Sequence, residues 1–186
     1  MRLPLFAART LRMPPAMRFL ALLLLVATIP TLAAAATKPR PKSGPEAIGT
    51  FDDWIAATNK EAGETVCYAF TRPHGSAPAI RGRGDVVLTV TERQGGRDAV
   101  AISAGFSYAA NAAVKFLVDS TPFDFYTAQR SAFARDGHAV VTAMQRGRQA
   151  VARSPGPKGA DVADTFSLRG FSAAYAAINK RCPASK

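Results

Sequence analysis

The sequence predicts a mainly β fold: an antiparallel β-sandwich or barrel-like domain with one short helix in mid-chain and one C-terminal helix. Three observations predict it. Apolar residues alternate with polar ones over short stretches, and turn-forming Gly, Pro and Asp residues separate these stretches. In two further segments the apolar residues recur at the spacing of a helix. Many short strands with frequent turns are typical of sandwiches and barrels.

The first 36 residues have the pattern of a secretory signal peptide. Four arginines without any acidic residue precede the apolar run "FLALLLLVATIPTL", and the small residues "AAAAT" follow it. The apolar run is about 14 residues long, shorter than the ~20 that a membrane-spanning helix needs. We therefore expect cleavage near Ala36, a periplasmic, outer-surface or secreted protein, and no transmembrane span in its mature form.

Residues 37–47 are expected to form a Pro-rich basic linker, and residues 48–183 a single domain. The linker lacks apolar periodicity, and a mature chain of 150 residues suits one domain with its own core. That chain carries 20 basic and 13 acidic residues, a net charge of +7. This charge permits weak attraction to an anionic envelope or host-surface component, although solubility alone accounts for it.

The first half of the domain reads as strands and turns. Alternation at Val86, Leu88 and Val90 indicates a half-buried strand, and "RQGGR" supplies the hairpin turn after it. The same reasoning predicts strands at 54–58, 66–72, 100–106, 114–118 and 123–127. Residues 72–84 are rich in Gly and Pro and are expected to form a loop.

The second half contains both predicted helices. Asp136 is the expected N-cap of a short helix over 137–146, which Gly147 ends. Strands are predicted at 149–153 and 161–166. Ser167 is the expected N-cap of the closing helix, and Pro183 ends it. One face of that helix carries apolar residues at 3-4-3-4 spacing: Leu168, Phe171, Tyr175, Ile178 and Cys182.

Cys67 and Cys182 are the only cysteines. Two cysteines in an exported chain predict one disulfide, which would tie the last helical turn to an early strand. It would close a loop of 115 residues, worth about 4–5 kcal/mol in the chain-entropy model. An intermolecular disulfide and a reactive thiol remain as alternatives.

No catalytic, cofactor or metal site is predicted. The chain lacks a Gly-x-Ser-x-Gly elbow, a phosphate loop and a dinucleotide fingerprint. His74 and His138 have no paired metal-ligand spacing and are expected to be exposed polar residues. Asp52 and Asp53 are expected to cap a turn ahead of a packed Trp54, since neighbouring residues of an extended segment point to opposite faces.

Arg83-Gly84-Asp85 is a tripeptide that cell-adhesion receptors read on exposed loops. Here it leads directly into a strand, so we interpret Gly84 as a turn residue and Asp85 as the start of the hairpin. Nucleic-acid binding is not expected, because the aromatic residues alternate with aliphatic ones as core residues do and do not interleave with arginines.

Several segments together resemble the invasion-associated locus B family of exported proteins from Gram-negative bacteria. They are "GTFDDW", "VCYAF", "RGDVVLTVTER", "RDAVAISAGFSY" and, most specific, "DTFSLRGFSAAYAAINKRC". The resemblance runs from about Ile48 to Cys182. Many members carry another cysteine shortly after the tryptophan, whereas Thr58 stands four residues after Trp54 here. The chain is therefore similar to a sub-branch with one cysteine pair.

The resemblance implies a periplasmic or envelope-associated protein with a proposed role in host-cell invasion, and it implies no catalytic residue. The leading hypothesis is a non-enzymatic exported protein that binds an unknown protein or an anionic envelope or host-surface component. Alternatives are a periplasmic envelope-maintenance or chaperone-like factor, which an exposed sheet edge or apolar patch would favour, and a hydrolase. The partner and the oligomeric state are left open.

Overall fold

A computed structural model describes residues 44–185, so the predicted signal peptide and residues 37–43 of the linker lie outside the described residues. The elements in chain order are β1 (Glu46–Phe51), β2 (Trp54–Glu61), β3 (Glu64–Thr71), β4 (Gly75–Ala77), β5 (Val87–Arg93), β6 (Gly96–Ser103), β7 (Ala113–Val118), β8 (Thr121–Ala128), β9 (Ser131–Ala134), α1 (Gly137–Met144), β10 (Gln149–Pro155), the 3-10 helix η1 (Pro157–Gly159), β11 (Asp161–Ser167) and α2 (Phe171–Arg181).

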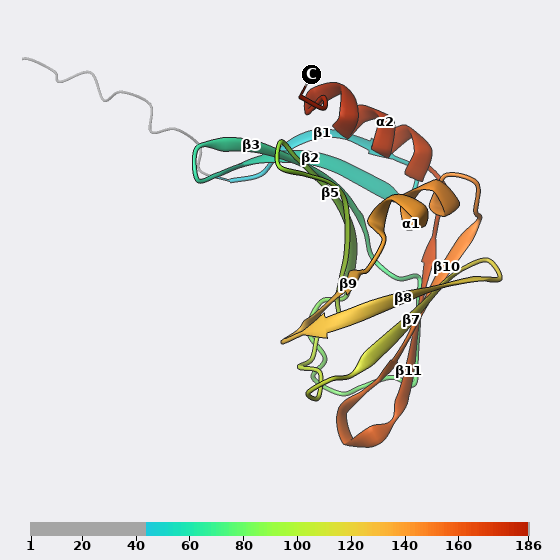
Figure 1. Cartoon of the computed structure of the whole chain (residues 1–186). Coiled ribbons are helices and arrows are strands. Elements are labelled where there is room, and N and C mark those ends of the chain that lie inside the picture. Colours follow the sequence, from blue (N-terminus) through green and yellow to red (C-terminus); the bar gives the residue numbers. More distant parts are fainter. Residues whose placement is uncertain (1–43, 186) are drawn as a thin grey trace, which may run out of the picture. The chain divides into compact units, whose positions relative to one another are not determined.

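All eleven strands form one antiparallel sheet in the order β1-β2-β3-β5-β6-β9-β8-β7-β10-β11-β4 (Figure 1). This confirms the mainly β class with a mid-chain and a C-terminal helix. The sheet does not close into a barrel, because β1 and β4 remain as its two edges. Within residues 44–185, neither α-helix is long and apolar enough to cross a membrane.

The strands follow the alternation that the sequence predicts. In β5, Leu88 and Val90 are fully buried, whereas the intervening Thr89 and Thr91 point to the outer face. The turn between β2 and β3 has positive φ at both Ala62 and Gly63, 48° and 89°, which is the backbone that a two-residue hairpin turn prefers. The local pattern thus sets both the buried face and the hairpin.

The two ends of the sheet approach each other across the core. β2 is second and β11 tenth in the strand order, yet the indole Nε1–H of Trp54 donates to the carbonyl oxygen of Ser167 at 3.0 Å. The backbone N–H of Asp53, in the β1–β2 turn, likewise donates to the carbonyl oxygen of Arg169, just after β11, at 3.4 Å. The sheet therefore bends around one core, and these contacts hold its ends together without a complete strand ladder.

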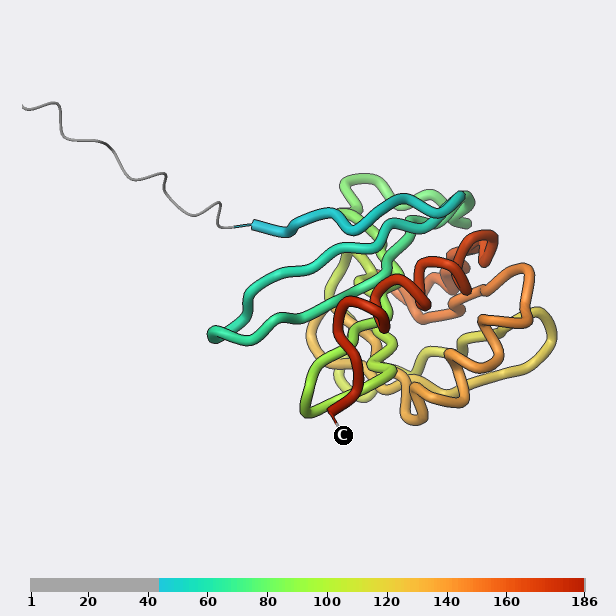
Figure 2. Tube along the Cα trace, turned by 90° about the horizontal axis from the view of Figure 1, so that it is seen from above, coloured from blue at the N-terminus to red at the C-terminus, as the bar shows by residue number. Residues whose placement is uncertain are grey.

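The helices cover the bent sheet. α2 packs on β1, β2 and β3, and α1 packs on β6 (Figures 1 and 2). The Trp54 ring meets the Phe171 ring with 4.7 Å between centroids. Trp54 is completely buried, as predicted. The other large apolar side chains that are fully buried in the described residues are Phe116, Phe125, Phe166, Phe171, Leu88, Ile102, Met144 and Ile178.

The two predicted N-caps have different outcomes. Asp136 caps α1, because its Oδ1 accepts the Ala139 N–H at 3.0 Å. The prediction for Ser167 is wrong: β11 ends there, and the N-cap of α2 is Gly170, whose φ is +85°. A Cβ on Gly170 would lie 2.0 Å from the carbonyl oxygen of Phe51. Glycine is therefore required where the β11–α2 connection crosses the β1–β2 turn.

The structure also contains strands that the sequence analysis did not predict. β4 lies within the predicted loop 72–84 and pairs with β11, and β9 pairs with both β6 and β8. β1 begins at Glu46, so the last two residues of the predicted linker pair with Thr58 and Ala57 of β2.

We expect Trp54→Phe to lower the free energy of unfolding by about 1–3 kcal/mol, because the Ser167 carbonyl loses its donor while a ring remains in the core. The measurement is urea denaturation followed by circular dichroism, since Trp54 is the only tryptophan and its fluorescence disappears. The neighbouring Ile55→Ala, on the exposed face, is the control. Equal losses for the two variants would contradict the role of the indole hydrogen bond.

Candidate functional site

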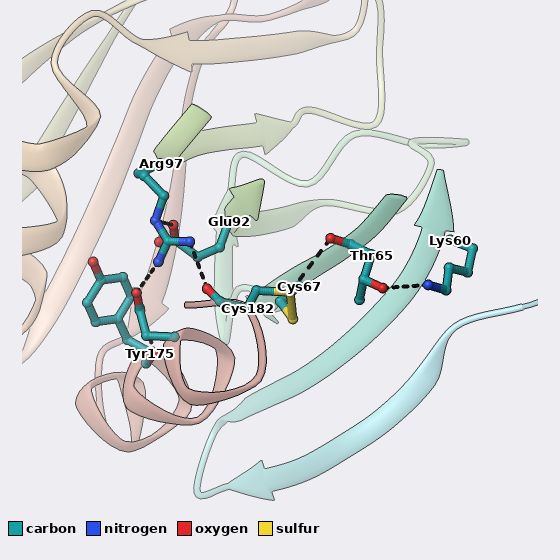
Figure 3. The surroundings of a disulfide bond; sticks show 8 residues. Lys60, Thr65, Cys67, Glu92, Arg97, Tyr175 and Cys182 are labelled. Atoms are coloured by element: carbon teal, nitrogen blue, oxygen red, sulfur yellow. Dashed lines mark hydrogen bonds and ion pairs between the residues drawn. A yellow bond between two sulfur atoms is a disulfide. The ribbon is translucent and has the colours of Figure 1, made fainter. Parts of the chain in front are cut away.

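Cys67 and Cys182 form the predicted disulfide, with 6.0 Å between their Cα atoms (Figure 3). Cys67 is fully buried on β3, and Cys182 is the C-cap residue of α2. Because both cysteines are in this bond, neither an intermolecular disulfide nor a free reactive thiol applies to the described residues. The bond holds the end of the last helix on the sheet, where a terminal helix otherwise frays.

Arg97 lies beside the disulfide and connects the β5–β6 hairpin to the same helix end (Figure 3). Its guanidinium donates to the Cys182 carbonyl oxygen at 2.7 Å and to the side-chain oxygen of Asn179. Its Nε forms an ion pair with Glu92 at 2.7 Å. One side chain thus contacts the final helical turn and a buried carboxylate together.

Asp98, the next residue on β6, joins both helices to the sheet. Its Oδ1 accepts a hydrogen bond from the Tyr175 hydroxyl of α2. Its Oδ2 lies 2.7 Å from Nδ1 of His138 at the start of α1. We call Glu92, Arg97, Asp98, His138 and Tyr175 the carboxylate clamp, since each of its groups bonds to another member.

Burial and neighbouring charges shift the pKa values of the clamp. Burial, reinforced by the adjacent Asp98, raises the pKa of Glu92 to about 7, and the Arg97 guanidinium limits that rise. Burial opposes ionisation of Asp98, but hydrogen bonds from Tyr175 and His138 outweigh it and lower the Asp98 pKa. The hydrogen bond to Asp98 in turn raises the His138 pKa. One Glu92 oxygen, Oε1, is buried without a hydrogen-bond partner.

The clamp has the character of a structural tie between sheet and helices. The carboxylates of the clamp are buried. His138 is its most exposed member, with 81% of the side chain accessible. A raised pKa keeps a larger fraction of His138 protonated at neutral pH, so less of the imidazole is available to accept a proton. Among residues 44–185, no group of three or more His, Cys, Asp or Glu has the geometry of a metal site.

The Arg83-Gly84-Asp85 tripeptide is not displayed as an adhesive loop. The Arg83 side chain is 8% exposed and forms a two-pronged ion pair with Asp164 at 2.8 and 2.7 Å, over the Phe106 ring. Asp85 is exposed and pairs with Arg72. The guanidinium is therefore enclosed. The prediction of a turn at Gly84 is wrong, because the turn lies just before it, at Arg81 and Gly82, and β5 begins at Val87.

The remaining sequence candidates are separate surface residues. Asp52 lies in the β1–β2 turn and pairs with Arg169 at 3.0 Å, while Asp53 is exposed beside it. His74 lies in the loop after β3, next to β11. The structure does not bring these residues together with His138 of the clamp into a common site.

The outer face of the sheet carries a continuous uncharged row that we call the outer-face belt. Consecutive cross-strand pairs place its residues side by side across six strands: Ile55 (β2), Phe70 (β3), Thr89 (β5), Ala101 (β6), Phe133 (β9) and Tyr126 (β8). Residues paired in this way point to the same face. Ile55 and Tyr126 are 38% and 46% exposed, and they are the two large hydrophobic residues exposed within 44–185.

The β2–β3–β5 part of this face is hollowed. A depression of about 560 Å³ follows the outer side chains of β5 and β3, including Thr89, Thr91, Tyr68 and Phe70. At one end, Arg93 and Glu61 pair with each other at 2.7 Å. The depression therefore offers apolar and hydroxyl groups, and the charges at its end neutralise one another.

Neither the clamp nor the belt was predicted from the sequence. Glu92 continues the alternation of Leu88 and Val90, so the pattern already placed a carboxylate on the buried face, and this signal was available. Treating the alternating aromatic residues as core was wrong for Tyr126, because β8 points this ring outward. The belt itself depends on which strands pair, which no local pattern shows.

Comparison with known proteins identifies relatives of the chain. The family model described as "Invasion associated locus B (IalB) protein" matches residues 54–179. The fold is similar to the crystal structure of invasion associated protein B from Bartonella henselae, with a TM-score of 0.54, 16% sequence identity, and coverage of 72% of this chain and 95% of that chain. At this identity the structural likeness concerns the fold alone. No curated protein sequence matches the chain.

We expect the double variant Cys67→Ala/Cys182→Ala to lose about 2–5 kcal/mol of unfolding free energy, because its unfolded chain is no longer cross-linked. Urea denaturation measures this loss, and the reduced wild-type protein should show a similar one. Thiol labelling of the denatured, unreduced protein should modify neither cysteine. Labelling of both would contradict the disulfide.

We expect the protein to become more stable as the pH falls from about 7 to about 4.5. The pKa of Glu92 is about 7 in the folded state and 4.5 in the unfolded state. Between these two pH values the folded state binds the proton more tightly, so protonation favours folding. The raised pKa of His138 acts in the same direction, whereas the lowered pKa of Asp98 costs stability only below its ordinary 3.8. Urea denaturation at several pH values measures the trend.

Glu92→Gln should weaken this pH dependence, since the variant no longer titrates at that position. The matched control is Glu61→Gln, which removes an exposed glutamate that pairs with Arg93 outside the clamp. If the pH dependence of Glu92→Gln equals that of the wild type, the buried carboxylate is not its source.

Proposed function

Because the chain belongs to the invasion associated locus B family, we propose that it is an exported envelope protein that acts by binding a partner and not by catalysis. The disulfide supports an oxidising compartment outside the cytoplasm, where such bonds persist. The signal-peptide pattern of residues 1–36 supports the same location. The family description supports a role in invasion, which would place the partner in the envelope or on a host surface.

The outer-face belt is the observation that carries this proposal. Large apolar side chains of a folded domain are normally turned inward. Here Ile55 and Tyr126 are exposed at the two ends of the row and Phe70 and Phe133 are half-buried between them, which supports an interaction surface. Here the inward face of every belt strand already packs on the core, so the outer row is not needed for folding. The clamp, by contrast, is occupied in tying the helices to the sheet and offers no open pair of reacting groups.

Envelope maintenance or a chaperone-like activity is the second candidate, and the open edge of β1 favours it. β1 is the first strand of the sheet and pairs with β2 alone, so its outer backbone groups are available for strand addition. Protease treatment of intact and osmotically opened cells discriminates the two. Cleavage on intact cells supports contact with a host, and protection until opening supports maintenance.

We expect Ile55→Asp/Tyr126→Asp to weaken binding of the purified mature protein to a Gram-negative envelope fraction roughly tenfold or more, since charges would enter the uncharged contact. Co-sedimentation with the fraction measures binding. The matched control is Ser120→Asp together with a second exposed position, Ser172→Asp, which adds the same charge away from the belt. Unchanged binding of the belt variant, with its fold intact by circular dichroism, would contradict the proposed function.

A further inference from the structure

We propose that the outer-face belt binds a neutral saccharide chain; this inference rests on the proposed function of the belt as the contact surface. A pyranose ring has apolar C–H faces and a rim of hydroxyl groups. A surface that binds it therefore needs aromatic side chains, small hydroxyl side chains and no uncompensated charge. The belt supplies each of these.

Aromatic side chains stand on both sides of the central strands. Tyr68 and Phe70 of β3 lie on one side, with 6.0 Å between ring centroids. Phe133 of β9 and Tyr126 of β8 lie on the other, stacked at 5.5 Å. The Arg135 guanidinium lies 5.7 Å from the Tyr126 centroid and helps to fix that ring. Such pre-oriented rings bind without loss of side-chain entropy.

Small side chains form the floor between these rings. Phe70 and Phe133 are three strand positions apart, about 14 Å at the usual strand spacing. Between them lie Thr89 and Ala101 of the belt and, in the next row, Thr91. The backbone groups of β5 and β6 are engaged in the sheet, so the threonine hydroxyls are the polar groups that this floor offers.

Two ion pairs lie on the β2–β3–β5 side of the belt, which favours a neutral occupant there, whereas Arg135 at the other end lies against the Tyr126 ring. Arg93 pairs with Glu61 and Arg72 with Asp85, at 2.7 and 2.8 Å. An anionic glycan or lipid headgroup would need cations that are free to receive it. A hydrocarbon chain would need an enclosed cavity, whereas this depression is open along β3 and β5. Hydroxyls beside rings on an open surface match a sugar chain.

The test measures binding to an immobilised panel of neutral oligosaccharides built from hexose and N-acetylhexosamine units, with heparin as the anionic member. We expect the wild-type protein to bind neutral members and to bind heparin no better. Thr89→Val/Thr91→Val should weaken that binding roughly tenfold, because it removes hydroxyls while keeping shape and strand preference. The matched control is Thr165→Val, on the outer face of β11 and outside the belt.

A second arm uses the envelope fraction and separates this inference from the proposed function. Periodate, which cleaves the diols of sugars, should abolish binding to the fraction, and prior protease treatment of the fraction should not. If no neutral oligosaccharide binds, or if protease and not periodate abolishes binding, the saccharide inference is overturned. Sensitivity to Ile55→Asp/Tyr126→Asp would then still support the belt as the surface for a protein partner. Loss of that sensitivity as well would overturn the proposed function.

Discussion

The indole of Trp54 is the contact on which the arrangement of sheet and helices depends. Its N–H donates to the Ser167 carbonyl near the far end of the sheet, and its ring packs on Phe171 at the start of α2. One side chain thus joins β2, the end of β11 and the last helix. The bend that results encloses a single core on the inner face and leaves the outer face of the sheet to solvent.

The C-terminal helix is held at its beginning, middle and end by different kinds of interaction. Phe171 packs on Trp54, Tyr175 donates to Asp98, and Cys182 is bonded covalently to β3. Hydrophobic burial and the disulfide supply stability. The ion pair of Glu92 with Arg97 adds little to the stability, because removing two charges from water costs about as much free energy as their attraction returns. Such a pair fixes where the helix lies on the sheet.

The groups that stabilise the fold lie on the inner face of the sheet, so the side chains of the outer face are available for function. The inner side chains and the clamp stabilise the fold, and the antiparallel ladders hold the belt residues in register across six strands. A surface built on paired strands is ordered before any partner arrives, which lowers the entropic cost of binding. The family relationship and the disulfide agree with a protein that works outside the cytoplasm.

The sequence by itself determined the mainly β class and the Asp136 cap, and it predicted the pairing of Cys67 with Cys182 that the structure confirms. Alternation and capping are local patterns, and two cysteines allow a single intramolecular pairing. Only the tertiary structure decided that Gly170 and not Ser167 precedes α2 as its N-cap, that β9 connects β6 to β8, and that Asp98 meets Tyr175 and His138. Each of these depends on segments far apart in the chain. The physical reason is that register between distant strands is set by shared packing in the core, which no short stretch of sequence contains.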